Sequence, residues 1–168
     1  ALRETLERDP DERLADILAA TLAVADEPDE DVGRKALRDL KADLHLLTAL
    51  ADLGGVWNLD AVTGALARFA DAALNAAVAL TARAEIERGR LVAVAPGPAG
   101  PIPGLMIIAM GKHGAFELNY SSDIDISFFY EPERLPLAEG VEAGDVAVRI
   151  AHGVARTLQD RTADGYVF

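Results

Sequence analysis

The chain has 168 residues, which is enough for one domain of ordinary size or two small ones. Its hydrophobic content of 51% includes only 5% aromatic residues, a balance that favours helices packed through small side chains over an aromatic-rich sheet. A net charge of −12 with no basic stripe argues against a nucleic-acid partner. The sequence has no cysteine, no signal peptide and no apolar run near ~20 residues. We therefore expect a cytoplasmic protein with no disulfide and no membrane partner.

Residues 1–94 form a predicted helical region with three antiparallel helices. Hydrophobic residues recur there every three or four positions, the spacing of one helix face, and acidic or amide residues stand at each predicted start. The first helix begins at Asp9 with Pro10 at its first position, the second begins in the acidic run 26–31 and stops at Gly54, and the third runs from Asn58 to about Arg88. His45 and His152, the latter in a later helix, are predicted to be packing or surface residues.

The pattern changes after residue 94. Residues 95–104 are rich in proline and glycine and predict a linker, and the apolar run 105–110 predicts a buried strand. A turn over 111–122, with a short helical piece at 115–118, then leads into a second strand at 123–130. The sequence thus predicts an α+β fold, in which a helical N-terminal part precedes a partial sheet.

The C-terminal part continues with one more helix. Its apolar spacing predicts a helix over 142–162, followed by a turn at Asp164-Gly165 and the start of another strand at 166–168. The segment 105–168 therefore reads as one core that is truncated at its C-terminal end.

The stretch from Gly111 to Asp125 carries the candidate chemistry. On a strand, alternation places Asp123 and Asp125 on one face and Ile124 and Ile126 on the other, with like-facing residues roughly 6 to 7 Å apart. Two such carboxylates could both reach one divalent cation or a pair of them.

Polar groups beside the carboxylates predict phosphate binding. Gly111 permits a tight turn whose N–H groups could hold a phosphate, and Lys112, Ser121 and Ser122 add a charge and hydroxyl groups. A calcium loop and a P-loop do not fit the spacing. The simplest alternative is that Asp123 and Asp125 face solvent on an edge strand, where charge blocks unwanted pairing.

These residues resemble a known family. An apolar strand, a glycine turn and Asp-x-Asp on the next strand are similar to the nucleotidyltransferase superfamily that includes DNA polymerase beta. The longer string Glu-Leu-Asn-Tyr-Ser-Ser-Asp-Ile-Asp at 117–125, with Asp-Gly-Tyr-Val-Phe at 164–168, resembles the glutamine synthetase adenylyltransferase family of bacterial nitrogen control. His113 stands where that family usually has an apolar residue, so no role is assigned to it.

The resemblance implies a function. The motif at 117–125 is similar in sequence to that of the half of the family enzyme that removes AMP from a glutamine synthetase tyrosine by phosphorolysis and releases ADP. It implies catalytic and metal-binding roles for Asp123 and Asp125, and nucleotide or phosphate contacts for Gly111, Lys112, Ser121 and Ser122. It also implies Mg²⁺, ADP, ATP and phosphate as ligands, and glutamine synthetase and the regulatory PII protein as partners. A third carboxylate is expected beyond Phe168, so the chain alone is expected to be inactive.

Three alternatives stay open at this point. The adenylylating half of the same family would transfer AMP from ATP to the tyrosine through a similar acidic pair. A non-catalytic module would use its helices to dock glutamine synthetase or PII. Another small nucleotidyltransferase is disfavoured by the length of the matching string.

Overall fold

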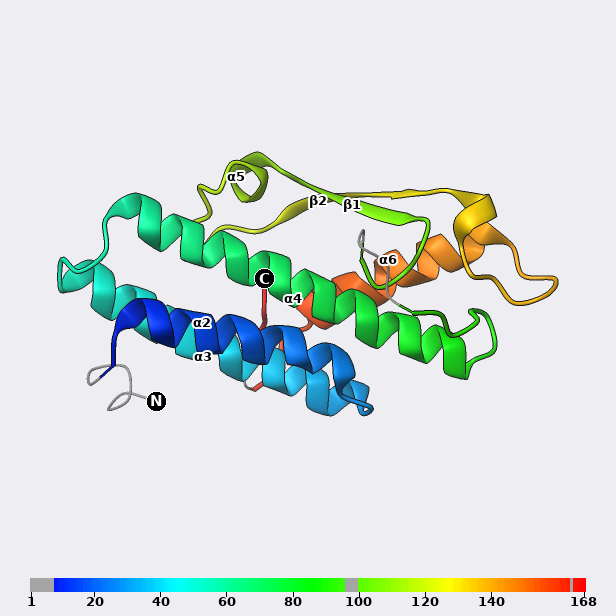
Figure 1. Cartoon of the computed structure of the whole chain (residues 1–168), viewed down its shortest axis with the longest axis horizontal. Helices are drawn as coiled ribbons and strands as arrows, with labels where there is room; N and C mark the ends of the chain where they lie inside the picture. The colour runs from blue at the N-terminus through cyan, green and yellow to red at the C-terminus, as the bar shows by residue number, and fades with distance from the viewer. Residues whose placement is uncertain (1–7, 96–99, 164) are drawn as a thin grey trace.

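The computed structural model describes residues 8–95, 100–163 and 165–168. Long helices form one layer, and a small antiparallel sheet lies across it (Figure 1). This arrangement confirms an α+β architecture with a helical N-terminal part. In chain order the elements are α2 (Pro10–Ala23), η1 (Val24–Asp26), α3 (Glu30–Leu53), α4 (Leu59–Glu87), β1 (Leu105–Met110), α5 (Gly111–Gly114), β2 (Asp125–Tyr130), η2 (Pro132–Arg134) and α6 (Ala143–Gln159).

Side-chain caps fix the starts of the first three helices. The Asp9 carboxylate accepts hydrogen bonds from the backbone N–H groups of Asp11 and Glu12 at the start of α2. Asp29 caps α3 in the same way, and the Asn58 side chain accepts from the N–H of Ala61 at 2.9 Å. Each cap satisfies an N–H group that the helix itself cannot pair. The predicted starts at Asp9 and Asn58 are therefore confirmed. Within the predicted acidic run 26–31, Asp29 is the residue that caps the second helix.

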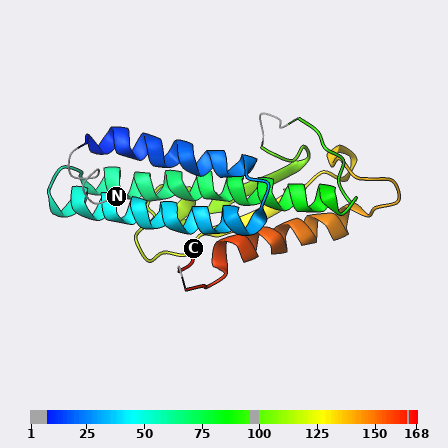
Figure 2. The same ribbon diagram turned by 90° about the horizontal axis from the view of Figure 1, so that it is seen from below.

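Helix α4 is the centre of the fold. It packs against α2 and α3 on one side and against α6 and α5 on the other (Figures 1 and 2). Alanines at many of its buried positions let the neighbouring helices approach closely. The helix is also long and apolar enough to cross a membrane by length and composition, and 78% of its most apolar window is buried inside the structure. Packing against its neighbours accounts for that hydropathy.

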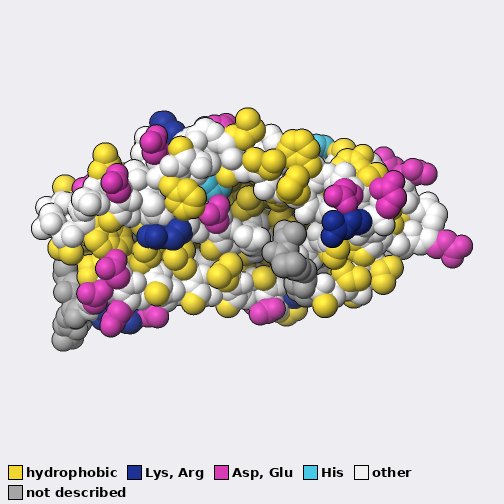
Figure 3. All heavy atoms as spheres, turned by 45° about the horizontal axis from the view of Figure 1, so that its top comes forward, with side chains coloured by type: hydrophobic (Ala, Val, Ile, Leu, Met, Phe, Trp, Pro, Cys, Tyr) yellow, Lys and Arg dark blue, Asp and Glu magenta, His cyan; other side chains and the backbone are white. Residues whose placement is uncertain are grey.

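The sheet has one covered face and one open face. Strands β1 and β2 pair antiparallel, with Ile107 opposite Phe128 and Met110 opposite Asp125. Leu105, Ile107 and Ala109 of β1 point towards α4. The alternate residues Met106, Ile108 and Met110 are exposed on the other face. Figure 3, turned so that the top of Figure 1 comes forward, shows hydrophobic side chains gathered on the surface. Because Asp125 pairs with Met110, it lies at the end of this open, mostly apolar face.

Three predicted boundaries in the C-terminal half are wrong. Strand β2 begins at Asp125 rather than at residue 123, so Asp123 precedes the strand. The short helix between the strands is α5 at Gly111–Gly114, not 115–118, because the chain turns sharply at Phe116, which has a positive φ of 59°. Helix α6 ends at Gln159 rather than at 162, and the backbone at its C-cap, Asp160, leaves the helical region.

The proline- and glycine-rich segment is partly built into the core. Residues 96–99 of the predicted linker lie outside the described residues. Ile102 is buried, and a Cβ atom on Gly104, which has φ of 81°, would lie 2.9 Å from the backbone of Arg134. One hydrophobic core runs continuously from α2 to Val167. The division into a helical region and a separate sheet domain stays a prediction.

The C-terminal residues dock on α6 instead of beginning a strand. The backbone N–H groups of Val167 and Phe168 both donate to the carbonyl of Leu158. Val167 is fully buried, and the Phe168 ring lies 6.1 Å from that of Phe69 in α4. Gly165 forms a small bridge with Thr162, while Asp164 of the predicted turn lies outside the described residues.

Candidate active site

The glycine turn brings a carboxylate against the backbone. Gly111 follows β1 directly and has a φ of 55°, a conformation that favours glycine. A Cβ atom on Gly111 would lie 2.8 Å from Oδ2 of Asp125. The missing side chain is therefore what allows the Asp125 carboxylate to lie against this turn.

A polar network joins the turn to the serines before β2. The Ser122 hydroxyl donates to Oδ1 of Asn119 at 2.7 Å, and the backbone N–H of Ser121 donates to the same oxygen at 3.3 Å. Lys112 Nζ lies 3.4 Å from the Ser122 hydroxyl. Lys112 and Ser122, both predicted phosphate contacts, are thus brought together, and Asn119 orders the loop that carries the two serines.

The two carboxylates are both exposed but border different cavities. Asp125 lines an open surface cavity of about 520 Å³ together with Gly111 and Gln159. Asp123 lines a smaller one of about 120 Å³ that includes Phe128 and Phe168. Neither carboxylate is sealed by the helices. The structure therefore places Asp125, rather than Asp123, beside the glycine turn.

A lysine from α3 approaches Asp123. Burial lowers the pKa of Lys41, and the nearby negative charge of Asp123 opposes that shift. The Lys41 ammonium also lies 4.6 Å from the centre of the Tyr166 ring and 5.0 Å from that of Phe168. Helix α3 thus supplies a positive charge near the edge of the site, which no local sequence signal indicates.

The same helix holds the motif segment through an aromatic contact. The ring of His45 meets that of Tyr120 edge to face at 5.8 Å. Burial lowers the pKa of His45, and the charge of Lys41 lowers it further. Burial also raises the pKa of the Tyr120 hydroxyl, an effect that its hydrogen bond with Thr48 opposes. His45 is therefore a packing residue, as the sequence predicts.

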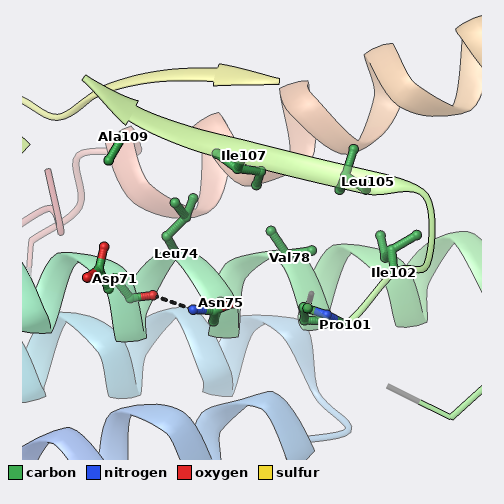
Figure 4. Close-up of a pocket in the computed structure, with 10 residues that line it drawn as sticks. Asp71, Leu74, Asn75, Val78, Pro101, Ile102, Leu105, Ile107 and Ala109 are labelled. Carbon is green, nitrogen blue, oxygen red and sulfur yellow. Dashed lines mark hydrogen bonds between the residues drawn. The ribbon is translucent and has the colours of Figure 1, made fainter. Parts of the chain in front are cut away.

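His113 anchors the turn to α4. It is 2% exposed, and its Nε2 lies 2.8 Å from Oδ1 of Asp71. Its Nδ1 has no hydrogen-bond partner among the described residues. Asp71 lies at one end of a cavity of about 270 Å³ between β1 and α4 (Figure 4). The sequence assigns no role to His113, although a histidine at a position that is usually apolar is a signal that a buried polar partner exists.

We expect the His113–Asp71 contact to stabilise the turn. Replacing Asp71 with Ala should lower the free energy of unfolding by about 1 to 3 kcal/mol, since the buried His113 ring then loses its partner, whereas His113→Leu leaves the half-exposed Asp71 to water and removes the same contact. A double-mutant cycle from urea unfolding measures the coupling between the two side chains. Arg68→Gln, which changes an exposed side chain of α4, is the control. Fully additive effects of the two substitutions would contradict the anchoring role.

Asp123 and Asp125 border different cavities, and the carboxylate beside the glycine turn, Asp125, is the one that suits a magnesium ion of the kind that relies on its substrate for further ligands. Carboxylate oxygens are the ligands that Mg²⁺ prefers, and this ion is commonly held by one or two carboxylates together with water and substrate phosphates. Asp123 and Asp125 are exposed, and Gly111 leaves the space next to Asp125 free of a side chain. No group of three or more His, Cys, Asp or Glu side chains is placed to bind a metal within residues 8–95, 100–163 and 165–168.

Comparison with known proteins gives consistent matches. The family model for glutamate-ammonia ligase adenylyltransferase matches residues 1–168. The chain is 67% identical over 160 residues to a protein of Caulobacter vibrioides named bifunctional glutamine synthetase adenylyltransferase/adenylyl-removing enzyme. Proteins of the same name from Bradyrhizobium diazoefficiens and Xanthobacter autotrophicus are 48% and 46% identical over 166 residues. These alignments cover 95%, 97% and 99% of the chain but only 16% to 17% of the relatives.

Proposed function

Because this chain belongs to the glutamate-ammonia ligase adenylyltransferase family, we propose that it contributes to a site that removes AMP from a tyrosine of glutamine synthetase. The proposed reaction is Mg²⁺-dependent phosphorolysis that releases ADP, in the control of nitrogen assimilation. The relatives carry both an adenylyltransferase and an adenylyl-removing activity in their names. We propose the direction that removes AMP because the sequence of the motif at 117–125 resembles that of the AMP-removing half.

One observation carries the proposal. The Asp125 carboxylate lies against Gly111, at the open end of the sheet, beside a loop in which Lys112 and Ser122 lie 3.4 Å apart. A carboxylate, a cation and a free backbone turn on one side of a surface cavity are the groups that hold a metal–phosphate complex. This arrangement supports a polymerase-beta-like nucleotidyltransferase site, which we propose as the fold relationship of the sheet.

The chain's residues have separate roles in this proposal. Asp123 and Asp125 would hold Mg²⁺, which supplies neutralisation of phosphate oxygens. Lys112 would add positive charge to the phosphate site, while the hydroxyl groups of Ser121 and Ser122 and the N–H groups near Gly111 would orient the phosphate oxygens.

The proposed reaction is an in-line displacement at the phosphorus of AMP. An oxygen of inorganic phosphate forms a new bond to that phosphorus, and the bond to the tyrosine oxygen breaks. The proton of hydrogen phosphate passes to the tyrosine oxygen, so the products are ADP and a free tyrosine hydroxyl. Positioning and charge neutralisation supply most of the catalysis in such transfers.

The direction of transfer is the decisive test. The longest natural polypeptide that contains this chain is incubated with AMP-modified glutamine synthetase, phosphate and Mg²⁺, and separately with unmodified glutamine synthetase, ATP and Mg²⁺. We expect ADP release in the first reaction that depends on Asp125, and its loss when EDTA removes the metal. If Asp125→Asn instead blocks only AMP incorporation in the second reaction, the chain serves the adenylylating half. If Asp125→Asn affects neither reaction, the chain is a docking module.

The proposal includes the setting of the reaction. Glutamine synthetase is the proposed protein substrate, and the regulatory PII protein is a further proposed partner, both in the cytoplasm. Family membership supports the first of these most directly, since the names of the relatives include glutamine synthetase.

A further inference from the structure

A further cavity lies where the C-terminal end of α4 passes α6. It has a volume of about 450 Å³, and it is formed between helices that lie side by side in Figure 2. Gly153 of α6 makes the close approach possible, because a Cβ atom there would lie 2.5 Å from Thr81 of α4. The cavity lies outside the candidate active site, and none of the predicted catalytic or phosphate-binding residues lines it.

Helix α6 presents basic side chains to this cavity. Arg149, His152 and Arg156 line it, and their spacing of three and four positions places them on one face of the helix. All three are exposed. In the part of the chain that the structure describes, neither Arg149 nor Arg156 has an acidic side chain within ion-pair distance.

The α4 side adds two arginines that share one carboxylate. Glu85 is 3% exposed, and its oxygens accept hydrogen bonds from Nη2 of Arg90 at 3.0 Å and from Nη1 of Arg88 at 3.2 Å. These contacts, led by the Arg90 hydrogen bond, lower the pKa of Glu85, so the carboxylate stays ionised and holds both guanidinium groups in place. One negative charge faces two positive charges here, which leaves one in excess.

The other carboxylate at the cavity is already engaged. Glu30 at the start of α3 forms an ion pair with Arg34 of the same helix. The cavity wall therefore carries four guanidinium groups against two carboxylates, and each carboxylate has a cationic partner. Such a concentration of positive charge is unexpected in a chain with a net charge of −12. Positive charges confined to a concave site raise the local potential and attract anions.

We propose that this cavity binds a small ligand with several negative charges on phosphate or carboxylate oxygens. Guanidinium groups recognise such oxygens through paired hydrogen bonds, and Arg149, Arg156 and Arg88 approach the cavity from two helices. The volume of about 450 Å³ falls in the range of about 300 to 1,000 Å³ that holds small molecules. A concave site of this size favours a small anion over the flat contact of an acidic protein surface.

The test is calorimetry with tripolyphosphate and, in parallel, citrate. It uses the longest natural polypeptide that contains this chain, at low salt and in buffer freed of divalent metals with a chelating resin, so that no Mg²⁺ can recruit the anion to the proposed active site and no soluble chelator competes with it. Arg149→Gln and Arg156→Gln should each raise the Kd about tenfold or more, since each removes charge-assisted hydrogen bonds. Arg134→Gln, an exposed arginine paired with Glu131 elsewhere, should change the Kd less than about twofold.

The outcomes separate the possibilities. A lower Kd for tripolyphosphate identifies a phosphate ligand and a lower Kd for citrate a carboxylate ligand, and both support the site when the α6 substitutions weaken binding. Equal weakening by Arg134→Gln would show only general charge attraction and would overturn the proposal. Loss of binding in Lys112→Ala would show that the anion binds at the glycine turn and would overturn the proposal. Tighter binding of a polyglutamate peptide than of either small anion would favour an acidic protein partner instead. Because no metal is present, the result is independent of the proposed AMP removal.

Discussion

Asp125→Asn and Asp123→Asn are each expected to abolish AMP transfer while leaving the protein folded. Both carboxylates are exposed, and Asp125 lies at the open end of the sheet against Gly111, so a neutral side chain of the same shape leaves the packing unchanged. Loss of a metal ligand removes several kcal/mol of transition-state stabilisation, and at ~1.4 kcal/mol per tenfold the rate should fall about 10³-fold or more. The measurement is ADP release from AMP-modified glutamine synthetase at saturating phosphate, with each substitution made in the longest natural polypeptide that contains this chain.

A matched control isolates the metal role. Asp31→Asn makes the same chemical change in a side chain that is 94% exposed at the start of α3, and its activity should stay within about twofold of the unsubstituted protein. Circular dichroism and the Tm should agree for all three variants. Near-normal phosphorolysis in both Asp123→Asn and Asp125→Asn would refute the metal-binding role.

Phe69→Ala is expected to cause the largest loss of stability from a single side chain. Phe69 lies in the middle of α4, is fully buried, and contacts the ring of Phe168 at the C-terminal end of the chain. Removing a buried aromatic ring costs about 3 to 5 kcal/mol, because the transfer energy is lost and a cavity remains. Since domains of this size are stable by only about 5 to 15 kcal/mol, much of the margin would disappear. Urea unfolding followed by circular dichroism measures the change.

The control for this substitution is a leucine at the surface. Leu53 at the end of α3 is 87% exposed, so Leu53→Ala should change the free energy of unfolding by less than about 0.5 kcal/mol. If Phe69→Ala lowers the free energy of unfolding by less than about 1 kcal/mol, the neighbouring side chains must move to fill the space that the ring leaves.

The features that were predictable from the sequence are those with local causes. Asp9 and Asn58 cap their helices because a side-chain oxygen can reach N–H groups two or three residues away, and this depends on little else in the structure. The strand at 105–110 was equally predictable, since its apolar run is bounded by glycines. The glycine turn beside Asp125 also follows from residue types that are close in sequence.

The contacts that were not predictable join distant segments. His113 and Asp71 are 42 positions apart, and the charge of Lys41 acts on Asp123 from 82 positions earlier in the sequence. Alternation along 123–130 predicted one strand and a shared face for both carboxylates, but pairing with β1 ends at Asp125. Asp123 therefore lies in the loop before β2. Its neighbours come from α3 and from the C-terminal residues.

The covering of α4 on opposite sides has a consequence for biosynthesis. Once α4 has emerged from the ribosome as far as Glu87, α2 and α3 can pack on one side of it, but α6 has not emerged in full until Gln159 follows. At a synthesis rate of about 5 to 20 residues per second, the alanine-rich surface that later meets α6 stays uncovered for about 4 to 14 s. During this interval the nascent chain exposes an apolar helix face to chaperones and to neighbouring nascent chains.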